Sequence, residues 1–185
     1  MALSLTTGPA VEPISLTEAK AQLRLEIDAD DTLVTSLIQS AREHAEHITK
    51  RQLITATWKL TLDAFPSVIT LPLPPLQSVS NIKYYDTDGV QQTLSTDLYQ
   101  VDSESQPARI VPAYNTTFPS TRIMANAVEV NFVCGFGDAA TDVPQKIKQA
   151  MLLFITWSYE DREAEKMKPQ AIDDLLSHYI ASIFV

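Results

Sequence analysis

The chain has 185 residues, and its 14 Lys and Arg against 23 Asp and Glu give a formal net charge of −9 at pH 7. This length and a hydrophobic share of 45% are typical of one globular domain with a sizeable core, and two small lobes are the alternative. The one cysteine excludes an intramolecular disulfide framework and a cysteine-rich zinc site. The acidic balance disfavours nucleic-acid binding by phosphate neutralisation, because that binding needs clustered Lys and Arg.

Membrane and secretory segments are not expected. The longest apolar run, residues 150–155, is far shorter than the roughly 20 residues that span a bilayer. The first residues have no basic start followed by an apolar stretch, so a secretory signal is not indicated. We therefore expect a soluble protein that makes no contact with membranes.

The first part of the chain predicts two helices. Ser15-Leu-Thr-Glu18 has the spacing of a capping box and predicts a short helix that ends near Leu25. The acidic residues 26–31 predict a loop and the N-cap of a second helix, because carboxylates favour the positive end of the helix dipole. From Thr32 to about Lys50 apolar residues recur at helical spacing, which predicts one amphipathic helix.

A block of strands is predicted next, because the apolar period changes from about 3.6 to two beyond Arg51. The turn Asp86-Thr-Asp-Gly89 predicts a hairpin in which Gly89 takes a positive φ. Pro72, Pro74 and Pro75 exclude a central sheet position for that segment. The predicted strands cover residues 53–62, 68–71, 78–85, 90–94, 98–101, 109–111 and 127–134.

Two more helical segments follow the strands. Pro144 is expected at the first position of a helix that ends near Arg162. A charged linker, 163–168, leads to a terminal amphipathic segment. Helices and antiparallel strands segregated in this way predict an α+β fold. In it, helical residues 14–52 and the 144–163 helix form a bundle beside a β block at 53–134, and a terminal helical segment covers 170–185.

A metal site is one alternative that the residues leave open. Glu43, His44 and His47 are close along one helix and predict a metal-dependent enzyme if they share a ligand-binding face. The spacing is not His-Glu-x-x-His, and polar residues opposite an apolar stripe are ordinary on a solvated helix face. The acidic groups at 28–31 and 86–88 lack the spacing of a calcium loop.

Nucleotide binding and nucleophilic catalysis are not favoured either. Gly135-Phe136-Gly137 and the following residues match a G-x-G-x-x-A pattern, but no parallel strand with an acidic residue follows. We interpret the pattern as a tight exit from an edge strand, and Cys134 as a core thiol. We therefore expect no catalytic, cofactor-binding or metal residues, and no cofactor.

Motifs spread along the chain resemble phage head–tail connector (adaptor) proteins. No single motif is specific, and the order and spacing together carry the resemblance, which covers roughly residues 14–162. The segments are 15–24, 30–38, 41–43, 51–58, 71–79, 84–89, 135–138, 143–144 and 157–162.

This resemblance implies a structural role without chemistry. Members of the family form rings of about twelve subunits beneath the portal of long-tailed phages and gene transfer agents. Each ring joins the portal to a stopper or tail-completion protein. The resemblance thus implies a ring of identical chains in the virion neck, made in the bacterial host cytoplasm, through which double-stranded DNA passes without specific binding. Another neck role, such as the stopper, is a further alternative.

Two groups of residues are expected to make the contacts. The last helix follows a charged linker, so its apolar residues are expected to meet a partner chain, which the resemblance implies is the portal. The hairpin is expected to meet the neighbouring subunit. The portal residues are Ile172, Leu175, Leu176, Tyr179, Ile180, Ile183 and Phe184, and the subunit-contact residues are Tyr84, Tyr85, Asp86, Asp88 and Gly89.

Overall fold

The computed structural model describes residues 1–161 and 167–181. These residues divide into two compact units, each built from separate stretches of the chain. The β unit comprises Met1–Gly8, Thr55–Gly135 and Ala181, and the helical unit comprises Pro9–Ile54 and Phe136–Ile180. Helices and antiparallel sheets are both present, so the predicted α+β class is confirmed. The assignment of residues 1–185 to a single domain stays a prediction.

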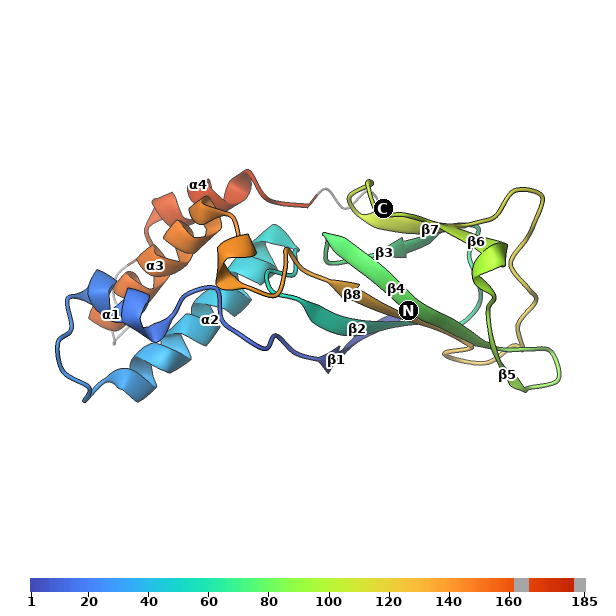
Figure 1. Ribbon diagram of the computed structural model, residues 1–185, viewed down its shortest axis with the longest axis horizontal. Coiled ribbons are helices and arrows are strands. Elements are labelled where there is room, and N and C mark those ends of the chain that lie inside the picture. Colours follow the sequence, from blue (N-terminus) through green and yellow to red (C-terminus); the bar gives the residue numbers. More distant parts are fainter. Residues whose placement is uncertain (162–166, 182–185) are drawn as a thin grey trace. The chain divides into compact units, whose positions relative to one another are not determined.

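The helical unit contains α1 (Leu16–Leu23), α2 (Asp31–Thr49), α3 (Gln145–Glu160) and α4 (Gln170–Ser177), as Figure 1 shows. The Ser15 and Glu18 side chains form the predicted capping box at the start of α1. Pro144 is the residue directly before α3, whereas the sequence predicts it at the first position of the helix. Helices α1, α2 and α3 contact one another, so the predicted bundle is confirmed, and α4 packs on α2 and α3.

One continuous apolar core fills the helical unit. Val34, Ile38 and Ala41 on α2 face Ile147, Met151 and Ile155 on α3, and all are at most 3% exposed. This spacing of three and four residues is the stripe that predicted the amphipathic helix. No helix in the described part of the chain is long and apolar enough to cross a membrane.

The β unit contains two antiparallel sheets. The larger has the strand order β1-β2-β8-β4-β5 and the smaller has the order β3-β7-β6. Their inward side chains form a second core that includes Phe132, Leu60 and Ile110, each 0% exposed. The strands are β1 (Ala2–Thr7), β2 (Ala56–Leu62), β3 (Ile69–Leu71), β4 (Leu76–Tyr85), β5 (Gln91–Thr93), β6 (Tyr99–Asp102), β7 (Ala108–Pro112) and β8 (Val128–Cys134).

Two features of the larger sheet differ from the sequence-based expectation. Strand β8 lies between β2 and β4, so the interpretation of Gly135–Gly137 as the exit from an edge strand is wrong. The sequence does not predict strand β1, because all its residues except Leu3 are exposed and its partners in β2 lie 50 to 59 residues away. The pattern of residues within one segment does not reveal a strand partner so far away in the sequence.

Candidate functional site

The hairpin between β4 and β5 is a closely bonded turn. The Asp86 carboxylate accepts hydrogen bonds from the backbone N–H of Val90 at 2.9 Å and of Asp88 at 3.1 Å, and from Gln92 Nε2 at 2.9 Å. These bonds, that of Gln92 first, lower the pKa of Asp86. Gly89 has the predicted positive φ of 84°. A Cβ atom there would lie 2.1 Å from an Arg122 guanidinium nitrogen, so a larger residue would have to displace the end of that side chain and adopt a φ that favours glycine.

The hairpin is joined by a segment that sequence reasoning missed. The Arg122 N–H donates to the Tyr85 carbonyl at 3.1 Å, and the Asn126 N–H donates to Asp63 Oδ1 at 2.9 Å. These bonds hold residues 121–125 over a pocket of about 570 Å³ that Asp63 and Ala64 also line. Ile123 is fully exposed there. The only signal in the sequence is an apolar Ile-Met pair within the long irregular stretch 112–126.

The hairpin residues and residues 121–125 form one surface, which we call the tip surface. Tyr84 and Tyr85 are partly buried, whereas Asp88 and Val90 are exposed. Phe65 packs against both Tyr84 and Phe118, with ring centroids 5.5 Å and 4.8 Å apart. Hydrogen bonds to Asp86, Tyr85 and Asp63 therefore fix the backbone of the tip surface, while Val90 and Ile123 remain exposed.

The terminal helix is more buried than expected. Ile172 and Leu176 on α4 are 0% exposed and belong to the core of the helical unit. Leu175 and Tyr179 are partly buried against the same core, and Ile180 is 49% exposed. Ile183 and Phe184 lie outside the described residues. Of the described residues that the sequence predicts to contact a portal, Ile180 thus has the most exposed side chain.

The residues of the alternative metal site take separate roles. His44 stacks on Phe154 with ring centroids 4.7 Å apart, and its Nε2 lies 3.2 Å from Lys168 Nζ. Burial, followed by the nearby Lys168 charge, lowers the pKa of His44. Glu43 accepts a hydrogen bond from Gln39 at 2.9 Å, and His47 is exposed. The described residues contain no group of three or more His, Cys, Asp or Glu side chains arranged to hold a metal ion.

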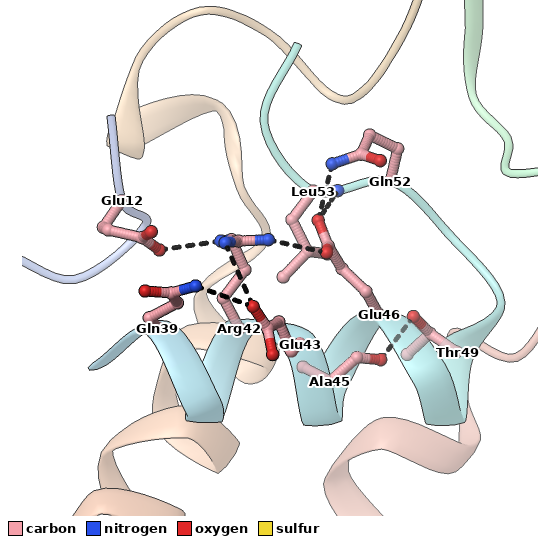
Figure 2. Close-up of polar contacts among 9 residues, drawn as sticks. All are labelled: Glu12, Gln39, Arg42, Glu43, Ala45, Glu46, Thr49, Gln52 and Leu53. Carbon is pink, nitrogen blue, oxygen red and sulfur yellow. Dashed lines mark hydrogen bonds and ion pairs between the residues drawn. The ribbon is translucent and has the colours of Figure 1, made fainter. Parts of the chain in front are cut away.

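Arg42, shown in Figure 2, is a buried charged residue of the helical unit, as is Lys148. Arg42 Nε donates to Glu12 at 2.8 Å and its Nη1 donates to Glu46 at 2.9 Å. Glu46 also accepts from Gln52 Nε2 at 2.7 Å and from the Leu53 N–H at 3.1 Å. Burial raises the pKa of Glu46. Each charged side chain of the cluster contacts an opposite charge, as is usual for buried charges that stabilise a fold.

This cluster fixes the segments that lead out of the helical unit. Glu12 follows β1 in the chain, and Gln52 and Leu53 precede β2. The Leu53 carbonyl in turn accepts a hydrogen bond from Phe136, which follows β8, at 3.0 Å. Helix α2 thus holds the chain at three of the places where it passes to or from the β unit. Sequence reasoning missed the cluster because its partners are up to 30 residues apart.

Taken together, these features are those of a protein that presents surfaces to other proteins. The tip surface and Ile180 are exposed, and Arg42 and Asp102 are bonded to partners within the chain.

Comparison with known proteins identifies the family. Residues 13–111, more than half of the chain, match the family described as phage gp6-like head-tail connector protein. The chain belongs to this family, so it is a structural connector protein, and the expectation of a protein other than an enzyme is confirmed. Comparison with curated proteins finds no match.

Solved structures of gene transfer agent particles contain chains of the same fold. A chain in the virion of a native particle is 22% identical with a TM-score of 0.84, and one in the neck of an empty particle computed with C6 symmetry is 23% identical with a TM-score of 0.86. A third, in the neck of a native particle computed with C12 symmetry, is 22% identical with a TM-score of 0.75. Each match covers 100% of this chain and 98% of the other.

Proposed function

We propose that this chain forms a ring of about twelve copies in the neck of a phage or prophage virion, around the channel through which DNA passes. The observation that carries the proposal is the family match over residues 13–111. The full-length likeness to chains from gene transfer agent necks, one computed with C12 symmetry, supports it. A closed ring needs two different surfaces on each subunit, one for each neighbour.

The partners proposed for the ring are the portal protein on one side and a stopper or tail-completion protein on the other. The segment directly after α4, in which Ile180 is exposed, is proposed to contact the portal. The tip surface is proposed to contact the neighbouring copy, because its backbone is fixed by Arg122 and Asp86 and needs no ordering on assembly.

The acidic charge suits this role. With −9 on each chain, a ring of about twelve copies carries on the order of −100, and an acidic channel wall repels phosphate. Packaged DNA then slides without being held. A strongly basic channel wall in an assembled ring would contradict this part of the proposal.

The experiment is to mix the purified full chain with the portal protein encoded by the same genome and to image the product by electron microscopy. We expect one ring of this chain attached to the tail-facing end of the portal. A chain that binds only the next neck protein, and not the portal, would assign it to the stopper role instead.

The role of the terminal segment needs variants that leave α4 in place, because Ile172 and Leu176 are 0% exposed and support the core. We expect Ile180→Asp, and separately a chain that ends at Ala181, to bind portal about tenfold more weakly or worse. The control is Ile27→Asp, which changes a 65% exposed residue of the helical unit. Unchanged portal binding by both altered chains, with unfolding temperatures like that of the control, would refute this contact.

A further inference from the structure

Strand β1 is an open edge of the larger sheet. It pairs on one side with β2, from Ala2 opposite Thr61 to Leu5 opposite Trp58, and the described residues place no strand on its other side. Proteins commonly protect such edges with charged residues, proline or a covering segment. The six residues of β1, Ala-Leu-Ser-Leu-Thr-Thr, include neither a charge nor a proline, and the irregularity before Thr7 is confined to its end. Its unpaired backbone groups are therefore available to another strand.

Two apolar rows cross the sheet and end at this edge. Their inner members are covered, since Leu60 and Phe132 are 0% exposed, whereas Leu5 at the end of one row is 50% exposed. Both rows lie on the face of the sheet that carries the core of the β unit. The rows are Leu3–Leu60–Val130–Ile82 and Leu5–Trp58–Phe132–Val79. A further strand with apolar residues two positions apart would extend both rows and cover Leu5.

We propose that the occupant of this edge is β1 of a second copy, paired antiparallel about Ser4. The sequence Leu3-Ser4-Leu5 reads the same in both directions, so this register places Leu3 of each copy opposite Leu5 of the other. Both apolar rows then continue from one copy into the next. Although each chain carries −9, β1 itself is uncharged and two such edges approach without local repulsion.

The result is a dimer of free chains with a continuous sheet. Its contact is isologous, because the same residues meet from both sides, whereas the contacts of the proposed ring are heterologous. The inference is thus separate from the proposed ring and concerns the chain before assembly. Because a single strand pair is a small contact, the association is weak and depends on concentration.

Cysteine cross-linking tests the register. In the proposed pairing the two Ser4 Cα atoms lie about 4.5 to 5.5 Å apart, which fits a disulfide, whereas the two Thr6 residues are offset by roughly 13 Å along the strands. We expect Ser4→Cys to form a covalent dimer on mild oxidation and Thr6→Cys to remain monomeric. Both positions are exposed, and the buried Cys134 is the same in both variants.

Sedimentation velocity over a range of concentrations tests the contact without a cross-link. We expect the wild-type chain to dimerise and Leu5→Lys to raise the dissociation constant by about tenfold or more, because it places a charge at the end of an apolar row. The control is Ile27→Lys, at a 65% exposed residue of the helical unit. A wild-type chain that stays monomeric throughout, or equal cross-linking of the two cysteine variants, overturns the proposal.

Discussion

Asp102, the last residue of β6, organises the turn that leads into β7. Its carboxylate accepts hydrogen bonds from Ser105 Oγ at 2.7 Å, Arg109 Nε at 2.8 Å and the Ser105 N–H at 3.1 Å. These bonds, that of the Ser105 hydroxyl first, lower the pKa of Asp102 to about 2. A carboxylate that is bonded only in the folded state links stability to pH.

The sign of this linkage gives a prediction. Folding lowers the pKa of Asp102 from 3.8 to about 2. The contribution of this carboxylate to stability is therefore complete when the pH is above its unfolded-state pKa, and it is lost as the pH falls toward its folded-state pKa. We expect Asp102→Asn to unfold at a lower temperature than wild type at pH 7, and the difference to narrow from pH 4 to pH 3. Calorimetry at these pH values measures it.

Asp88→Asn is the control for this measurement, because it removes the same charge from an exposed position in the hairpin turn. It is expected to leave the unfolding temperature near that of wild type at pH 7. A difference between Asp102→Asn and wild type that is constant from pH 7 to pH 3 would contradict the role assigned to the carboxylate.

At the scale of elements, α2 does more than supply an apolar stripe. Its Arg42 and Glu46 face away from solvent and bond to residues before α1 and after α2 itself. The helix therefore fixes the routes of the neighbouring chain segments as well as its own position. Such buried pairs are costly to disrupt on one side, because the remaining charge is left without a partner.

Substitution of Arg42 tests this role. The side chain is 11% exposed between Glu12 and Glu46, so Arg42→Met is expected to lower the free energy of unfolding by about 3 kcal/mol. Arg109→Met is the matched control, because its side chain is 55% exposed and an exposed pair contributes at most about 1 kcal/mol. Urea unfolding of both variants makes the comparison. Equal losses of unfolding free energy in the two variants would show that the burial of Arg42 does not determine its contribution to stability.

The elements that could be predicted from sequence are those with local signals. The capping box at Ser15, the stripe of α2 and the glycine turn at residue 89 each depend on residues within one or two turns of each other. The missed features depend on distant partners: β1 pairs with β2, Arg42 meets Glu12, and α4 buries Leu176 against the bundle. An amphipathic pattern shows that α4 has an apolar face but not which chain covers it.

At the scale of the whole molecule, the net charge of −9 sets how the chain meets DNA. Nucleic-acid binders gain affinity by releasing counterions from phosphates, and this gain is greatest at low salt. An acidic chain does not gain affinity for DNA in this way. The proposed passage of DNA through the ring therefore needs no binding site for DNA on the chain.

A mobility-shift measurement checks this at the condition most favourable to binding. We expect no shift of double-stranded DNA with the full chain at about 50 mM salt, and no change at about 200 mM. A basic DNA-binding protein in the same buffer shows that the assay detects electrostatic binding. Retention of DNA that weakens as salt increases would contradict the expectation.

The division of the chain into units has a consequence for inheritance. The chain leaves one unit for the other after residues 8, 54, 135 and 180, so a recombination breakpoint anywhere between residues 9 and 135 separates parts of both units at once. Exchange of either unit between related genomes by a single crossover would leave each with mismatched pieces. Selection is thus expected to keep the two units together. A variant of one unit should be inherited with the matching variant of the other.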